Sequence, residues 1–232
     1  MPYEDILAGT RSLLQHSPWA RNLDPSRLVA LGASFGGYMI NWIAGHQSQQ
    51  EYRFQALVMH DGMFDTRAFY YNTEELYFPE HDMPGVPWLQ PQNYERYNPA
   101  TPELLATWDT PMLVVHGGMD FRVDLHHGLA AFTTLQRRGI PSKMLYFPHE
   151  AHQVFNVRNQ IEWHRQALGW IGHWSGTPYT SEAGGEDASQ SASSSPSDDE
   201  QVSVAVDAAE ELQQWPVEPA AIVVGRRMNT LH

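Results

Sequence analysis

The sequence contains no cysteine, which excludes disulfide bonds, thiolate metal sites and cysteine nucleophiles. It is also poor in positive charge: 14 Lys and Arg residues stand against 27 Asp and Glu residues in a chain of 232, a formal net charge of −13 at pH 7. Because such a chain repels polyanions, we expect neither a nucleic-acid partner nor an anionic membrane as a partner. No apolar run is long enough to cross a bilayer.

The N-terminus, "MPYEDILAGTRSLL", carries acidic residues where a secretory signal peptide carries basic ones. The chain as written is therefore expected to be cytoplasmic, or secreted if a longer parent chain carries a signal peptide.

The composition divides the chain into two regions. Residues 1–174 alternate apolar runs with turn signals and are expected to form one domain. Residues 175–232 begin with "SGTPYTSEAGGEDASQSASSSPSDDEQ", which almost lacks large apolar side chains. Since this composition cannot bury enough apolar surface to offset chain entropy, it predicts a low-complexity, acidic, mostly disordered tail, with a weak helical pattern at 202–215.

Within the first region the hydrophobic period switches repeatedly between that of a strand and that of a helix. The expected strands lie at 27–32, 54–62, 111–118 and 142–148, and the expected helices at 3–15, 36–46, 124–139 and 159–174. This alternation predicts an α/β fold with a mostly parallel sheet and flanking helices. In the last helix, Ile161, Leu168 and Ile171 are expected to face the sheet. The long aromatic-rich connection at 64–109 is expected to serve function, because connections of that length are uncommon.

The stretch "LGASFGGY" contains the pattern G-x-S-x-G between a predicted strand and a predicted helix. A tight strand-to-helix turn would lift the Ser34 hydroxyl above the sheet, and side chains at Gly32 and Gly36 are expected to collide with that turn. The backbone N–H of Phe35, at the helix N-terminus, would supply one donor of an oxyanion hole. The pattern predicts a nucleophile, although an ordinary turn remains the alternative.

A nucleophilic serine needs a base and an orienting acid, which follow it in the order Asp, then His. Asp120 comes after the third strand and His152 after the fourth, and the carboxyl ends of parallel strands share one edge of a sheet. Ser34, Asp120 and His152 are therefore expected to meet. His149 is the alternative base, and Asp124 is better placed as a helix N-cap.

The sequence "HEAH" at 149–152 is one residue shorter than the zinc-binding pattern H-E-x-x-H and has no obvious third ligand. We therefore predict no metal and no cofactor. The "HGG" at 116–118 follows the serine rather than preceding it, so it is expected to shape the loop that carries the acid.

Five stretches together resemble the prolyl oligopeptidase family of serine peptidases, and within it the fungal dipeptidyl-peptidase V branch. They are "GASFGGYMINWIAGH", "HDGMFDTRAFYYNTEELYF", "HGGMDFRVD", "LQRRGIPSKMLYFPHEAH" and "EWHRQALGWIGHW". The resemblance covers about residues 3–174 and implies an α/β-hydrolase fold. It also implies a peptidase that releases N-terminal dipeptides from peptide substrates through Ser34, Asp120 and His152, and it favours His152 over His149.

The resemblance also implies where substrate binds. Phe35 would line the primary specificity pocket beside the nucleophile, and Arg122 matches in position residues that face substrate in the family. Phe64, Phe69 and Tyr70, after the second strand, are expected to line the same pocket.

Full-length relatives carry a β-propeller and N-terminal sheet strands, including a loop with a second oxyanion donor, that have no counterpart in this sequence. The strand at 27–31 is then expected to be an exposed edge prone to self-association. Two alternatives to a peptidase follow: an esterase that uses the same triad, and a catalytically impaired fragment, because loss of one oxyanion donor costs on the order of a hundredfold to a thousandfold in rate.

Overall fold

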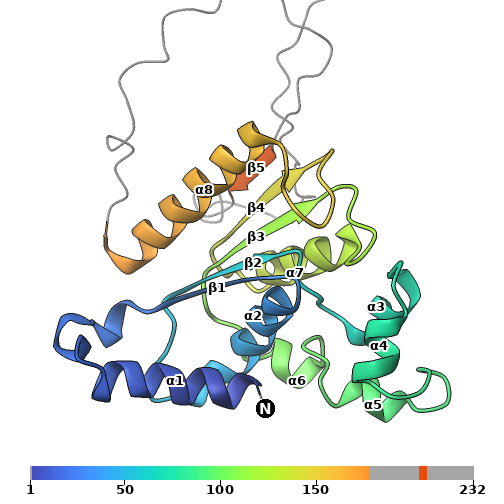
Figure 1. Cartoon of the computed structure of the whole chain (residues 1–232), viewed down its shortest axis with the longest axis horizontal. Coiled ribbons are helices and arrows are strands. Elements are labelled where there is room, and N and C mark those ends of the chain that lie inside the picture. Colours follow the sequence, from blue (N-terminus) through green and yellow to red (C-terminus); the bar gives the residue numbers. More distant parts are fainter. Residues whose placement is uncertain (1, 178–203, 208–232) are drawn as a thin grey trace, which may run out of the picture.

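The computed structural model describes residues 2–177 and 204–207. A five-stranded sheet in the order β1-β2-β3-β4-β5 lies at the centre (Figure 1), with β1 to β4 parallel and β5 antiparallel to β4. The strands are β1 Val29–Ala33, β2 Ala56–His60, β3 Met112–Gly117, β4 Ser142–Phe147 and β5 Val204–Asp207. The predicted fold class, an α/β fold with a mostly parallel sheet, is confirmed.

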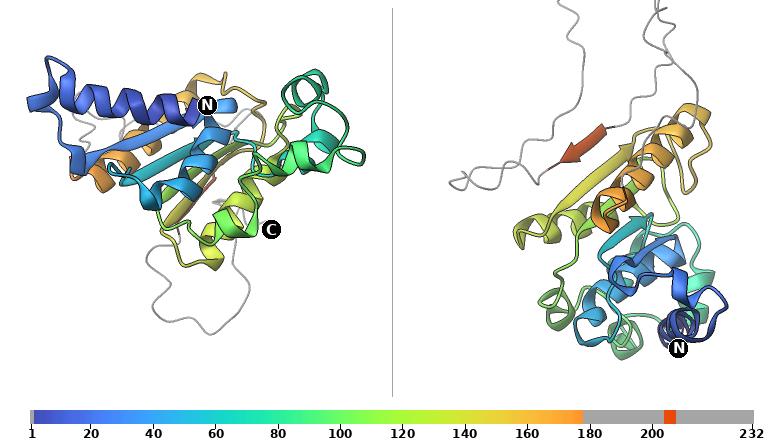
Figure 2. Two further views of the ribbon diagram at one scale, coloured as in Figure 1. Left: turned by 90° about the horizontal axis from the view of Figure 1, so that it is seen from below. Right: turned by 90° about the vertical axis from the view of Figure 1, so that its left-hand side faces the viewer.

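The strands read as continuous apolar runs because the sheet is covered on both faces. Leu57 and Met59 of β2 point to one face and belong to the core that packs under α2 and α7. Val58, Leu113 and Leu145 point to the other face and pack under α8. The molecule therefore has three layers, with the sheet between helices (Figure 2).

The helices that flank the sheet follow the predicted segments closely. They are α1 Pro2–His16, α2 Phe35–His46, α7 Leu125–Arg137 and α8 Val157–Ser175, with short 3₁₀ helices at Ala20–Asn22, Pro25–Arg27 and Gln47–Gln49. Asp124 caps α7, as expected, by accepting a hydrogen bond from the N–H of His126. None of the described helices combines the length and apolar character needed to cross a membrane.

The predicted inner face of α8 is wrong in two of its three residues. Ile161 is 64% exposed and Leu168 is 39% exposed, while Ile171 does pack against the sheet. The buried stripe instead runs through Trp163, Ala167, Trp170 and Ile171, at helical spacings of three and four. The tryptophan side chains, rather than most of the aliphatic ones, face the sheet. A prediction from the aliphatic residues alone therefore places the inner face of α8 wrongly.

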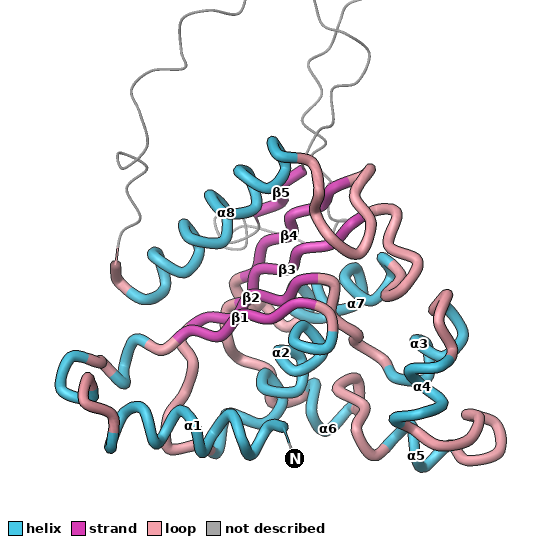
Figure 3. The backbone as a smooth tube through the Cα atoms, in the orientation of Figure 1, coloured by secondary structure: helices cyan, strands magenta, loops and turns pink. Residues whose placement is uncertain are grey.

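The connection between β2 and β3 forms four short helices, and α3, α4 and α5 gather in one lobe beside the sheet (Figure 3). They are α3 Thr66–Asn72, α4 Tyr77–Asp82, α5 Pro91–Glu95 and α6 Pro102–Leu105. A small aromatic and methionine cluster holds this lobe together around the buried Tyr94.

Of the expected tail, the structure describes residues 175–177, at the end of α8, and β5, a strand at 204–207 within the stretch where a weak helical pattern is predicted. The alternating "VAVD" fits a strand that pairs with an open sheet edge, and pairing with β4 overrides a weak local preference. The rest of the predicted disordered tail, 178–203 and 208–232, lies outside the described residues.

At the opposite side of the sheet, β1 is the edge strand among the described residues. Leu31 in this strand is 54% exposed.

Candidate active site

Ser34 stands in the turn between β1 and α2 with φ 59° and ψ −120°, and it is one of two non-glycine residues with positive φ in the described chain. A Cβ at Gly32 would lie 2.4 Å from the Gly36 carbonyl oxygen, so glycine is required there. The expected clash at Gly36 is absent. Gly37 is the second tight position, since its Cβ would lie 2.5 Å from the His60 oxygen. The turn is sharp because the first turn of α2, at Gly37, packs directly against the end of β2, at His60.

Asp120 lies in the loop after β3 and is buried. Its Oδ1 accepts hydrogen bonds from the backbone N–H groups of Arg122 and Val123, each at 2.9 Å. These two bonds fix the carboxylate within its own loop and leave Oδ2 free to face a partner.

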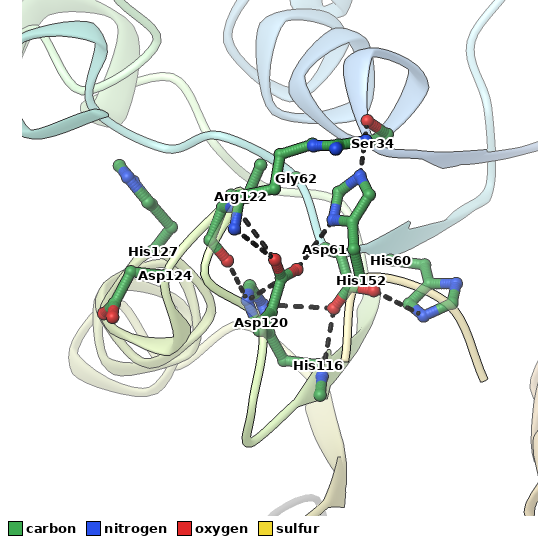
Figure 4. Close-up of polar contacts among 12 residues, drawn as sticks. Ser34, His60, Asp61, Gly62, His116, Asp120, Arg122, Asp124, His127 and His152 are labelled. Atoms are coloured by element: carbon green, nitrogen blue, oxygen red, sulfur yellow. Dashed lines mark hydrogen bonds and ion pairs between the residues drawn. The ribbon is translucent and has the colours of Figure 1, made fainter. Parts of the chain in front are cut away.

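His152, in the loop after β4, joins the other two residues into one hydrogen-bonded chain (Figure 4). Its Nδ1 lies 2.7 Å from Asp120 Oδ2, and its Nε2 lies 2.8 Å from Ser34 Oγ. With Nδ1–H donating to the carboxylate, Nε2 accepts from the serine hydroxyl. The structure therefore brings together the three residues that the sequence predicts to meet.

The neighbouring residues of "HEAH" have other positions. His149 is exposed, and Glu150 is buried. The Glu150 carboxylate accepts hydrogen bonds from the N–H groups of Phe155 and Asn156 and from the Asn159 side chain, at the start of α8. Glu150 is thus committed to holding the loop that carries His152.

Opposing effects act on the charge state of His152. Burial lowers its pKa, because burial penalises the imidazolium form. The hydrogen bond to Asp120 and the charges of Asp120 and Asp61 outweigh burial, although Arg122 opposes them. The net result is that the pKa of His152 is raised above its usual value.

A cavity of about 660 Å³ opens beside Ser34, between α2 and the lobe of α3 and α4. Three of the residues expected to bind substrate line it, namely Phe35, Phe69 and Arg122. Its walls are mainly apolar, so it suits the hydrophobic part of a ligand.

Phe64 and Tyr70, predicted for the same pocket, are not among the residues that line it. Phe64 packs edge-on against Trp108 in the core, and Tyr70 packs edge-on against Tyr94 within the lobe. Phe64 thus faces the loop before β3 and Tyr70 faces α5, rather than Ser34.

Sequence reasoning missed most of the cavity wall. Tyr38, Met39 and Trp42 of α2 contribute, and so do Met63 and Tyr97 from the connection between β2 and β3. The available signal is the spacing of three and four residues along α2, because it places one side of that helix toward the cavity.

A second cavity of about 510 Å³ meets the first at Ser34 and Arg122. Its lining includes His60, His152 and Trp163. Ser34 thus stands between an apolar space on one side and a more polar one on the other. This arrangement suits cleavage of a bond that joins two parts of a substrate, with one part in each space.

Arg122 is placed to reach both spaces. Its guanidinium lies 3.1 Å from Glu75 and 3.6 Å from Glu74 at the edge of the lobe. Within the described part of the chain, its Nε is buried and has no hydrogen-bond partner. Arg122 therefore keeps one unpaired donor beside two cavities that it shares with Ser34.

A model of the prolyl oligopeptidase family matches residues 1–178. The chain belongs to this family. That assignment agrees with the resemblance carried by the motifs around Ser34, Asp120 and His152.

Two relatives from fungi share much of the sequence. The chain is 47% identical over 173 residues to dipeptidyl-peptidase 5 of Schizosaccharomyces pombe, covering 75% of this chain and 24% of the relative. It is 43% identical over 175 residues to dipeptidyl-peptidase 5 of Trichophyton equinum, covering 75% and 23%. The chain thus spans about a quarter of the length of these curated relatives.

Among solved structures, Pyrococcus horikoshii acylaminoacyl peptidase superposes with a TM-score of 0.65 at 23% identity, covering 80% of this chain and 29% of that chain. At this identity the likeness shows that the two chains share a fold.

Proposed function

We propose that this chain carries the catalytic site of a serine peptidase that releases dipeptides from peptide N-termini. The observation that carries the proposal is the hydrogen-bonded chain from Ser34 through His152 to Asp120 at the mouth of an apolar cavity. Membership in the prolyl oligopeptidase family and the two dipeptidyl-peptidase 5 relatives support a peptidase over the alternative esterase.

The proposed reaction passes through an acyl-enzyme. Ser34 Oγ attacks the scissile carbonyl while His152 takes its proton, and His152 then gives that proton to the leaving amine. Asp120 fixes the imidazole tautomer and stabilises its charged form. A water molecule, deprotonated by His152, releases the acyl group. The Phe35 N–H, in the first turn of α2, is a donor for the oxyanion.

The two cavities supply roles for the two sides of the substrate. We assign the apolar cavity, with Phe35 and Phe69, to the residue on the acyl side of the scissile bond. The cavity beside His152 is assigned to the leaving group. Arg122, which lines both, would donate to a substrate carbonyl near Ser34.

The experiment that tests this function compares three substrates: a dipeptidyl-aminomethylcoumarin with a free amino terminus, the same compound N-acetylated, and p-nitrophenyl butyrate. We expect release of coumarin from the free dipeptide at a higher kcat/KM than from the acetylated one. Hydrolysis of the ester alone would replace the proposal with the esterase alternative, and no turnover of any substrate would match the impaired fragment.

The reactivity of Ser34 should depend on pH through His152. Only neutral His152 accepts the serine proton. Because the pKa of His152 is raised, the imidazole becomes neutral at a higher pH than an ordinary histidine does. The rate of labelling by a fluorophosphonate probe is therefore expected to climb with pH to a midpoint above about 6.5, the usual value for histidine. Stopped-time labelling from pH 5 to 9 measures it, and a midpoint below that value contradicts the assignment.

We also propose that the open edge of β1 drives self-association. Leu31→Lys places a charge on that edge and is expected to shift the chain toward monomer at a concentration where the parent associates. Leu13→Lys on α1 is the matched control, because Leu13 is 53% exposed and Leu31 is 54% exposed. Light scattering coupled to size exclusion measures the mass. A parent chain that stays monomeric at all concentrations rules the proposal out.

A further inference from the structure

A second buried carboxylate lies beside the three triad residues. Asp61 follows β2 directly, is fully buried, and has φ 45°. Among the described residues, Asp61 and Ser34 are the two non-glycine residues with positive φ. Strained backbone of this kind persists where surrounding contacts fix it, and it gathers at functional sites.

The contacts of Asp61 reach the strands that carry the other site residues. Its N–H donates to the Val115 carbonyl at 2.9 Å, and its Oδ1 accepts from the N–H of Gly117 at 3.1 Å. Its Oδ2 lies 2.8 Å from Nε2 of His60, whose carbonyl accepts from the N–H of Ser34 at 3.0 Å. Asp61 therefore connects the nucleophile turn to the end of β3.

Gly117 is where the loops of Asp120 and His152 cross. A Cβ at Gly117 would lie 2.2 Å from the Ala151 carbonyl oxygen, next to His152 in the chain. The hydrogen bond from Gly117 to Asp61 thus holds a point at which the two loops are in close contact. The placement of Asp120 against His152 depends on this point.

The charge of Asp61 also acts on the site. Polar atoms of Asp61, His116 and Asp120 lie within 4.8 Å of one another (Figure 4). His116 stands between the carboxylates, with Nδ1 3.7 Å from Asp61 and Nε2 3.8 Å from Asp120, and its Nε2 donates to the Val123 carbonyl at 2.8 Å. Two buried carboxylates therefore share one region beside His152.

We propose that Asp61 is a positioning residue of the triad: its side chain holds the Asp120 loop through Gly117, and its negative charge adds to that of Asp120 in stabilising protonated His152. This rests on the proposed function in one respect, namely that His152 is the base. The charged and titratable groups facing this region are His60, His116, Asp120, Arg122, His152 and, from α8, His164.

Two substitutions separate the roles of charge and hydrogen bond. Asp61→Asn removes the charge, keeps an oxygen acceptor for Gly117, and suits a left-handed backbone. Asp61→Gly adopts that backbone freely but removes both charge and acceptor. Glu103→Gln, an exposed charge removal on α6, is the control.

The pKa of His152 is read by NMR titration of its imidazole Cε1–H signal, assigned as the one missing in His152→Ala. We expect both Asp61 variants to lower the pKa of His152 and to move the acid limb of fluorophosphonate labelling to lower pH, while Glu103→Gln changes neither. The labelling rate at the alkaline plateau should fall about tenfold to a hundredfold in Asp61→Gly and less in Asp61→Asn, because a small misplacement of reacting groups is costly.

An unchanged pKa of His152 in a folded Asp61 variant overturns the proposal. If Asp61→Asn does not fold, Asp61→Gly provides the same reading. The NMR titration does not require turnover, so the link between Asp61 and His152 is tested even if the parent chain is not labelled. Absence of labelling would count against the proposed function alone.

Discussion

Replacing Ser34 with alanine is expected to lower kcat/KM for a dipeptidyl-coumarin substrate on the order of 10⁴- to 10⁶-fold. Ser34 Oγ is the one group of the site that forms a bond to the substrate, and Nε2 of His152 lies 2.8 Å from it, ready to take its proton. The residual rate of the variant comes from substrate binding and from stabilisation of the oxyanion, which do not need the serine nucleophile. Initial rates at substrate concentrations well below KM measure the effect.

The matched control is Ser12→Ala, an exposed serine on α1. It is expected to keep parental activity, and both variants should retain the parental melting temperature within a few degrees. If Ser34→Ala keeps more than about a tenth of the parental rate, the activity comes from another site or from a contaminant.

Asp120→Asn is expected to lower kcat about 10⁴-fold while leaving the fold intact. The amide keeps an oxygen for the Arg122 and Val123 N–H groups, which now bond Oδ1 at 2.9 Å. It presents an NH₂ group to Nδ1 of His152, which favours the imidazole tautomer that cannot accept the serine proton. The variant also removes the hydrogen bond and charge that raise the pKa of His152.

Asp124→Asn is the control for this substitution, since Asn is as good an N-cap as Asp at the start of α7. Steady-state rates across pH 6–9 compare the two variants. If Asp120→Asn stays within tenfold of the parent throughout this range, Asp120 does not orient His152.

The sequence predicted the parts of the molecule that local patterns determine. Each buried strand is an apolar run ended by a glycine or a polar turn, and parallel strands must deliver Ser34, Asp120 and His152 to one edge of the sheet. The fold and the meeting of these three side chains followed from that rule together with the family resemblance.

Other parts depend on contacts between distant segments. The apolar cavity is lined from α1, α2, α3, α4 and the Asp120 loop, so no single stretch describes it. Phe64 and Tyr70 are aromatic and close to β2 in sequence, yet their ring partners, Trp108 and Tyr94, lie 44 and 24 residues away in the chain and pull them from the cavity.

Asp61 illustrates the same limit. In the sequence it is one aspartate in "HDG", with nothing to distinguish it from a turn residue. Its importance comes from burial, a left-handed backbone and a hydrogen bond to Gly117, 56 positions away. Only the arrangement of β2 beside β3 makes that contact possible.

The most direct test of the account is to treat the purified chain with a fluorophosphonate, measure its intact mass, and map the adduct by peptide sequencing. We predict a single phosphonyl adduct on Ser34, absent in Ser34→Ala and formed far more slowly in His152→Ala. No adduct on a chain that circular dichroism shows to be folded, or an adduct on a different residue, would contradict the claim that Ser34, His152 and Asp120 form a working catalytic site.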